Sequence, residues 1–337
     1  MNNLKNISGT PGVTMIVPVY NGKSTLPALL DSLEKLDYRG ETEFIFVDDG
    51  STDDSGEYCR SRGYNVIRQV NQGPGIARNS GAKVARGEIL VFTDADCILD
   101  EDFITELIKP LLDSDIVGAQ GVFYSKQSNL VARFIQVEVQ ERINREKRAD
   151  NFDWVATYAA CYRKDVFLDN GGFSDIYSAE DAEFSMRLAR KGYKMVLVPS
   201  AKCQHINYEN FFKFLRFKYK RAYWIIWLYK KFPNMIVEDK MTPSSRKSMM
   251  ILMMGAILLL VLGIFWKWCF FAGEMMLLLF LASTIPFALK AWKLDKTIAL
   301  LSPFFLCART LSYIFGFGKG VIDYLRGIQT VKKSAAK

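Results

Sequence analysis

EILVFTDAD, residues 88 to 96, contains the apolar run ILVF and ends in two aspartates separated by one alanine. EFIFVDDGSTD, residues 43 to 53, has the same design, an apolar run that finishes in carboxylates. From residue 13 to residue 100, short β-branched runs alternate with helix-like stretches, the pattern of a parallel sheet covered by helices. Ligands of open α/β sheets bind at the carboxyl ends of the strands. The sequence therefore predicts an α/β fold with a polar site where these two strands end.

The same alternation extends to both sides of these stretches. Further strands are expected at 14–20 (TMIVPVY), 65–70 (NVIRQV), 115–124, 155–163 and 195–200. Leucines at helical spacing predict a helix over 26–33. Helices are also expected at 76–85, 101–112, 129–148 and 181–191. The first 200 residues thus supply enough elements for one sheet with helices between its strands.

Half of the 337 residues are hydrophobic, and the apolar residues are concentrated after residue 247. Ser248–Trp266 is an uncharged run long enough to span a bilayer, at about 1.5 Å per residue. Trp268–Leu289 is a second run, broken only by Glu274. A third, Ile298–Phe317, contains Arg309, which is costly at mid-bilayer unless it snorkels or pairs. We expect two spans, and a third segment that either spans or lies at the interface; buried core helices are the alternative.

The distribution of lysines predicts the topology of these runs. Cations precede the first run and follow the second, so both ends of this hairpin are expected in the cytosol with only the turn at 266–268 outside. A spanning third segment would put Lys332, Lys333 and Lys337 outside, against the positive-inside tendency. We therefore expect an interfacial or re-entrant third segment.

The net charge of +8 resides in one stretch, Lys202–Met250, which has eleven lysines and arginines against three acids. Aromatic residues are interleaved with these cations, directly before the apolar runs. This arrangement favours a membrane interface with anionic headgroups over nucleic-acid binding. The residues expected at that interface, or at a membrane-bound acceptor, are Arg216, Lys220, Arg221 and Trp224.

The cysteine and histidine content excludes several classes of site. Six cysteines lie far apart without a CxxC pair, which argues against a disulfide framework and a zinc knuckle. His205 is the single histidine, so triad hydrolases and multi-histidine metal sites are disfavoured. The polar first twelve residues do not resemble a secretory signal, and we expect the N-terminal domain to stay in the cytosol.

Five positions carry candidate chemistry, each with a simpler alternative. Asp94 and Asp96, at a strand end, can hold a hard divalent cation, or they form a solvated turn. Asp181 begins a helix and is either a general base or a helix cap. Arg78 follows NQGPG and either meets a diphosphate or is exposed on the surface. His205 is a metal ligand or an ordinary packed or surface residue.

Taken together, these pieces resemble the family 2 glycosyltransferases, inverting enzymes with the GT-A fold. The resemblance covers roughly residues 12 to 206. The matching segments are PVYN (18–21), VDDGSTD (47–53), NQGPGIARNSG (71–81), FTDAD (92–96), GGF (171–173) and AEDAEFSMRLARKGY (179–193). The resemblance implies a Rossmann-like mixed sheet with helices on both faces.

The resemblance also implies roles for individual residues. Pro18, Tyr20, Asp49, Arg78 and Asp94 would bind a UDP- or GDP-type nucleotide-sugar donor. A Mg or Mn cation would be held by Asp94, Asp96 and His205. Asp181 would be the catalytic base, while Glu180 beside it need not face the site.

The sequence departs from the family's pattern at one motif, and this departure concerns the acceptor. The processive members of the family carry a QxxRW motif, whereas the corresponding stretch here, residues 216–224, reads RFKYKRAYW. The implied activity is therefore nonprocessive transfer to a lipid-linked acceptor at the plasma membrane, in surface polysaccharide or glycan assembly. Transfer to polyprenyl phosphate and a noncatalytic, donor-binding membrane scaffold are the alternatives. No nucleic-acid partner is expected.

The expected division of the chain follows from these features. A catalytic domain at 12–206 precedes basic, aromatic interface helices at 207–247. A membrane region with two or three spans occupies 248–320, and a basic tail occupies 321–337.

Overall fold

The computed structural model describes residues 9–113, 115–147, 152, 154–234 and 244–328. The chain forms two compact units. Among the described residues, the first unit lies within 9–126 and 142–206. The second contains residues 127–141 and 207–329.

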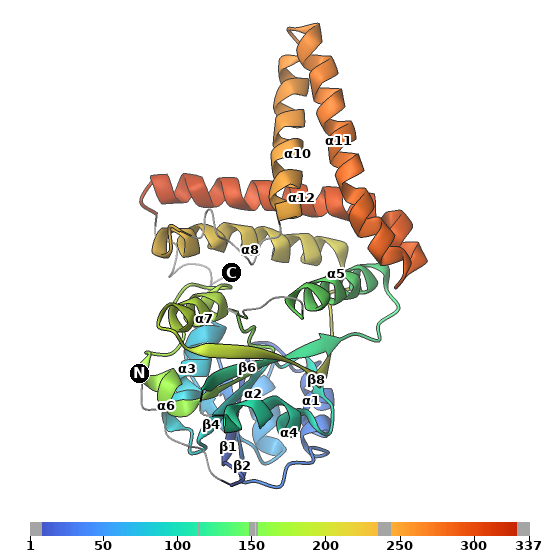
Figure 1. The fold of residues 1–337 in the computed structure, drawn as a ribbon. Coiled ribbons are helices and arrows are strands. Elements are labelled where there is room, and N and C mark those ends of the chain that lie inside the picture. The colour runs from blue at the N-terminus through green and yellow to red at the C-terminus, as the bar shows by residue number, and fades with distance from the viewer. Residues whose placement is uncertain (1–8, 114, 148–151, 153, 235–243, 329–337) are drawn as a thin grey trace. The chain divides into compact units, whose positions relative to one another are not determined.

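Within the described residues, the first unit is built on one eight-stranded mixed sheet (Figure 1). The strands are β1 (Val13–Val19), β2 (Thr42–Asp48), β3 (Asn65–Arg68), β4 (Ile89–Thr93), β5 (Cys97–Leu99), β6 (Ile116–Tyr124), β7 (Ala159–Arg163) and β8 (Lys194–His205). Their order across the sheet is β3-β2-β1-β4-β7-β6-β8-β5. The first four strands run parallel, whereas β7 is antiparallel to both of its neighbours.

Helices connect these strands. They are α1 (Leu26–Leu33), α2 (Ser55–Ser61), α3 (Pro74–Val84), α4 (Phe103–Ile108), a 3₁₀ turn at Lys109–Leu112, α6 (Lys164–Asp169) and α7 (Glu180–Arg190). Helix α5 (Leu130–Glu146) contains the point at 141–142 where the chain passes from one unit to the other. The mixed sheet with its helices confirms the predicted fold class.

Strand β4 lies at the centre of the sheet, and all five of its residues are buried. Helices on both faces explain why its sequence is a continuous apolar run without alternation. Phe92 packs against Phe167 and Phe173, with ring centroids 5.3 Å apart in both pairs. The central strand, which Asp94 directly follows, is therefore held by an aromatic core.

Several elements differ from the sequence prediction, and helix α6 was not predicted. Strand β8 continues past Ser200 to His205, because residues 202–204 pair with β6 and residues 203–205 pair with β5. Strand β5, three residues long, was not predicted. The polar sequence AKCQH does not look like a strand, but after a shift in its register with β6 this segment pairs with β6 on one side and with β5 on the other.

In the part of the chain that the structure describes, the second unit has four long helices in addition to the first part of α5. They are α8 (Phe211–Lys231), α10 (Ser244–Leu262), α11 (Lys267–Trp292) and α12 (Lys296–Leu325). The last three are long and apolar enough to cross a membrane, which indicates a membrane-associated protein. Helices α10 and α11 form a hairpin (Figure 1). Many aliphatic and aromatic side chains of the two helices are exposed.

Candidate active site

The predicted carboxylates meet at one edge of the sheet. β1 lies between β2 and β4 and is parallel to both, so the three carboxyl ends are adjacent. Tyr20 follows β1, Asp49 follows β2, and Asp94 follows β4. Tyr20 is half exposed at this edge. Pro18 is part of β1 and pairs with Val47 of β2.

The loops after β1 and β2 are joined through Asn21, which adopts a positive φ of 51°. Its backbone N–H donates to Ser51 Oγ at 3.0 Å, and its side-chain oxygen accepts from the Thr52 N–H at 2.8 Å. Asparagine tolerates this left-handed conformation better than most residues. The VYN and DDGSTD segments therefore form one fixed platform rather than two separate turns.

Asp49 is buried and holds the start of the NQGPG loop. One carboxylate oxygen accepts from the Gln72 N–H at 2.9 Å, and the other accepts from the Gly73 N–H at 2.8 Å. The Gln69 side chain adds a third hydrogen bond at 2.7 Å. Burial raises the pKa of Asp49 even though these donors favour the charged form. Its predicted contact with a nucleoside stays a prediction.

Gly73 has a φ of 93°, in the left-handed region that favours glycine. A Cβ at this position would lie 2.9 Å from the Tyr177 ring. Glycine at 73 is therefore required both by the backbone conformation and by the close approach of the segment that precedes α7.

Arg78 is buried, so the alternative of surface exposure is wrong. Its guanidinium donates to Asp94 Oδ1 at 2.5 Å and to Glu180 Oε1 at 3.1 Å. Gly75 makes room for this arrangement, because a Cβ there would lie 2.8 Å from Glu180 Cγ. Arg78 thus joins the FTDAD and AEDAE segments, and the sequence did not indicate Glu180 as part of this link.

Asn79, the neighbour of Arg78 on α3, holds the GGF segment. Its side chain accepts from the Phe173 N–H at 2.9 Å and donates to the Phe173 carbonyl at 2.8 Å. These two bonds leave the amide in a single orientation. Two consecutive residues of α3 therefore position both segments that surround the start of α7.

Asp181 lies in the first turn of α7, half-buried, beside Glu180. Its carboxylate accepts from the Ala182 N–H at 2.7 Å. The positive end of the helix dipole favours a charged carboxylate at this position. Burial, followed by the neighbouring Asp181, raises the pKa of Glu180 to about 7. Asp181, at the start of the helix, stays the predicted base, and Glu180 is the partner of Arg78.

Asp96 and His205 lie together, with Asp96 Oδ1 3.5 Å from His205 Nε2. His205 is the last residue of β8 and pairs with Cys97, so the sheet register itself brings it to the FTDAD segment. Its Nδ1 atom is buried and has no hydrogen-bond partner among the residues that the structure describes. A carboxylate and an imidazole fit a divalent cation such as Mn²⁺. Asp94, the third predicted ligand, is paired with Arg78.

Cys97 belongs to the same compact group of possible ligands. Its thiol is buried and donates to the Tyr158 carbonyl at 3.7 Å. Thiolates are soft ligands, whereas Mg²⁺ and Mn²⁺ favour oxygen. A hard cation bound here would therefore be held by Asp96 and His205, whereas Cys97 packs in the core.

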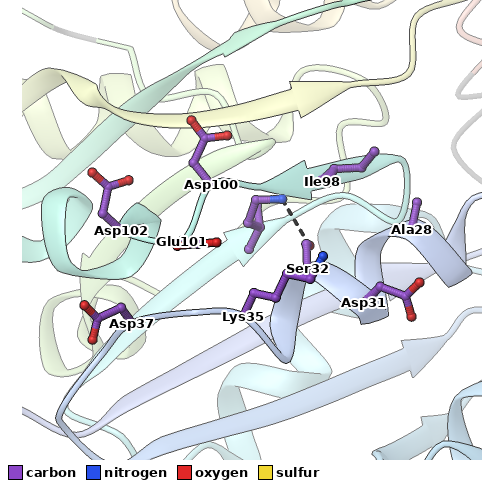
Figure 2. A pocket seen from close by; sticks show the side chains of 10 residues that line it. Ala28, Asp31, Ser32, Lys35, Asp37, Ile98, Asp100, Glu101 and Asp102 are labelled. Atoms are coloured by element: carbon purple, nitrogen blue, oxygen red, sulfur yellow. Dashed lines mark hydrogen bonds between the residues drawn. The ribbon is translucent and has the colours of Figure 1, made fainter.

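A separate pocket of about 590 Å³ lies between α1 and the segment 98–102 (Figure 2). Most of its polar lining is acidic, and the Leu99 N–H donates to Ser32 Oγ across it at 3.1 Å. None of the predicted site residues is among the described residues that line it. Its acids serve below as controls for substitutions at the sheet edge.

Of the predicted interface residues on α8, Arg216 is exposed, Lys220 and Arg221 are half-buried, and Trp224 is buried. The Trp224 ring packs edge-on against Tyr223, with centroids 5.3 Å apart. Trp224 is therefore a packing residue within the second unit as well as a candidate for the interface.

The buried ion pairs of Arg78 predict a large loss of stability for Arg78→Met. This substitution leaves Glu180 and Asp94 without their shared cation, and breaking a buried pair costs roughly 3 to 5 kcal/mol. We expect a loss at the lower end of this range, because Asp94 is partly exposed. Thermal unfolding of the full chain in detergent measures it.

Arg86→Met is the matched control, because Arg86 is largely exposed in its pair with Glu43 and should change stability little. Adding Glu180→Gln to Arg78→Met should restore part of the stability by removing the uncompensated charge. An Arg78→Met chain as stable as the unsubstituted one would contradict the buried link.

Comparisons with known proteins are consistent with this geometry. Residues 14–168 match the family model described as glycosyl transferase family 2. Glycosyltransferase GlyA of Streptococcus pneumoniae is 36% identical over 118 residues, which cover 34% of this chain and 17% of GlyA. Glycosyltransferase AglE of Haloferax volcanii is 27% identical over 202 residues, covering 56% of this chain and 64% of AglE.

Among solved structures, the mannosyltransferase PcManGT from Pyrobaculum calidifontis, in complex with GDP-Man and Mn²⁺, is similar with a TM-score of 0.65 and 19% identity. The match covers 94% of this chain and 88% of that one, which shows a shared fold across both units. Among the curated relatives, the match spans less than two fifths of GlyA and of glycosyltransferase GlyG from the same species.

Proposed function

Because the chain belongs to glycosyltransferase family 2, we propose that it moves a sugar, with inversion, from a nucleotide-sugar donor to a lipid-linked acceptor. The observation that carries this proposal is the Arg78 link, which joins the carboxylates after β4 to the start of α7. Donor-binding and base residues that lie far apart in the sequence are thereby held in one site. We infer that the donor is of the UDP or GDP type.

Each residue of the site has a distinct task in this proposal. Tyr20 and Asp49 hold the nucleoside at the edge formed by β1 and β2. Asp96 and His205, with Asp94, hold a Mg or Mn cation, which would neutralise charge on the leaving diphosphate. Asp181 takes the proton of the acceptor hydroxyl as that oxygen attacks the anomeric carbon from the face opposite the diphosphate.

The second unit supports a membrane-bound acceptor. Helices α10 and α11 are each long enough to cross the bilayer. We propose that they do so as a hairpin with both ends in the cytosol, so that the catalytic unit faces the cytosolic side of the plasma membrane. The exposed Arg216 and the half-buried Lys220 and Arg221 of α8 would then meet anionic headgroups or the charged group of the acceptor.

The proposal predicts transfer from a UDP- or GDP-sugar into a lipid fraction. Membranes that contain the full chain should be incubated with labelled nucleotide sugars and Mn²⁺, and the label extracted into organic solvent should be measured. The matched control is Asp181→Asn, assayed at the same protein level. Donor binding without transfer or hydrolysis of any sugar would contradict the enzyme and favour a donor-binding scaffold.

The same assay distinguishes the two kinds of acceptor. Mild acid cleaves the bond between a sugar and a lipid phosphate or diphosphate, so the size of the labelled product that it releases distinguishes the acceptors. Label released on a larger saccharide, or label that stays in the lipid fraction, indicates a glycosidic bond to a hydroxyl group. Label released as a free monosaccharide indicates direct transfer to polyprenyl phosphate. In that case the nucleophile is already anionic, so Asp181→Asn should cost much less than with a hydroxyl acceptor.

A further inference from the structure

Helix α12 has two faces whose polarity is opposite to that of an ordinary surface helix. Its buried residues include Arg309, Thr310 and Asp323. Its exposed large apolar residues are Leu300, Phe304, Phe315, Ile322, Tyr324 and Leu325. Lys296 and Thr297 in the first turn, and Lys319, are also exposed. At about 100° per residue, all of the apolar residues except Tyr324 fall within roughly 80° of the helix circumference. From residue 300 onward, the helix therefore directs Arg309 and Asp323 toward the protein and an apolar stripe outward.

The buried charges of α12 are paired with other helices of the second unit. The Arg309 guanidinium donates to Glu138 of α5, and the other oxygen of Glu138 accepts from Lys218 of α8 at 2.9 Å. Burial opposes ionisation of Glu138, but the two cations hold its pKa well below the usual range. Tyr223 of α8 donates to Asp323 at 3.1 Å. Arg309 is thus tied to one particular partner.

Close backbone contact fixes α12 along α8. Gly316 and Gly320 face α8, and a Cβ at Gly320 would lie 2.8 Å from the Tyr223 carbonyl. The Ser312 hydroxyl donates to the Leu215 carbonyl at 2.6 Å. Small residues four positions apart let two helices approach at this distance. The two helices therefore lie at the same depth relative to any membrane.

The sequence of α8 determines what that depth is. Its 21 residues include seven lysines and arginines and no acid. A helix of this composition is too charged for the hydrocarbon core but suits the headgroup region of an anionic membrane. Because α12 is fixed to α8 from residue 312 to residue 323, it cannot cross the bilayer without carrying those cations into it.

We propose that α12 lies along the surface of the bilayer rather than across it, with its stripe of exposed apolar residues against the acyl chains. The occupant of the stripe is lipid, because α12 packs directly on α10 and α11, whose outer surfaces are equally apolar. Figure 1 shows α12 lying across the direction of the α10–α11 hairpin, as expected if the hairpin spans and α12 does not. Length and composition alone place α12 among the candidate spans.

Depth measurements on spin labels test this placement. The full chain with Cys269→Ser and Cys307→Ser receives one cysteine at Leu300 or Phe315 and is placed in phosphatidylethanolamine vesicles containing phosphatidylglycerol. The four remaining cysteines are buried. Labels at 300 and 315 should report the same depth, although they lie about 22 Å apart along the helix. A depth difference close to that spacing would overturn the proposal.

Matched controls come from α10 in the same background. Labels at Ile251 and Leu258, both exposed, should differ in depth by about 10 Å if α10 crosses the bilayer. A reporter fused after Lys337 provides a second readout that does not depend on labelling. It should lie on the same side of the membrane as a reporter fused at the N-terminus, and a reporter on the opposite side would refute the placement. Neither measurement requires sugar transfer.

Discussion

Asp181→Asn should lower turnover by a factor of about 10² to 10⁴ with a hydroxyl acceptor, while donor binding changes little. Asparagine keeps the side-chain oxygen that accepts from the Ala182 N–H, so the start of α7 should form as before. What it removes is the group that takes the proton. Turnover and donor affinity should be measured separately, by initial rates and by titration calorimetry with the nucleotide sugar.

Asp102→Asn is the matched control for this substitution. Asp102, like Asp181, lies at the start of a helix, where it is the residue before Phe103 of α4. It is exposed and lines the pocket of Figure 2. We expect its turnover to equal that of the unsubstituted chain. If Asp181→Asn weakens donor binding by the same factor as turnover, the base assignment is wrong and Asp181 serves the cation or the structure instead.

The second large loss of activity is expected when a predicted ligand of the cation is removed. Asp96→Ala removes the carboxylate beside His205, and transfer should fall to the background level. Chelation with EDTA should have the same effect on the unsubstituted chain, and added Mn²⁺ or Mg²⁺ should reverse it. Calorimetry provides a readout besides activity, because donor binding should require the cation in the unsubstituted chain and should no longer respond to it in Asp96→Ala.

Asp31→Ala serves as the control for Asp96→Ala. Asp31 is an exposed acid of the pocket of Figure 2, paired with Arg62 at 3.1 Å. Its activity should retain the same dependence on the cation. Full transfer in the presence of EDTA would exclude a cation-assisted reaction and leave Asp96 and His205 as a structural pair.

Most of the strands and the carboxylate edge were predictable because they depend on local patterns. Buried parallel strands read as apolar runs, and residues that end adjacent strands share an edge. Strand β5 and the end of β8 were missed, because pairing with distant strands, rather than local hydrophobicity, makes those residues a strand. As a result, the proximity of Asp96 and His205 followed from the family resemblance and not from the local pattern.

The partners of Arg78 could not be predicted from the sequence around it. Its sequence context suggested either contact with a diphosphate or an exposed position. The structure buries it between Asp94 and Glu180, and Glu180 is 102 residues away in the chain. Charge pairing over such a separation depends on how α3 and α7 pack against each other. The local sequence around each residue does not determine this packing.

By itself, the sequence determined the α/β class, the acids at the carboxyl edge, the family, and the presence of apolar helices long enough for a membrane. These properties depend on periodicity and composition, which are local. Only the tertiary structure decided which charges are paired: Arg78 with Asp94 and Glu180, and Arg309 with Glu138. The physical reason is that burying a charge is tolerable only beside a partner, and the fold alone determines which distant residue provides it.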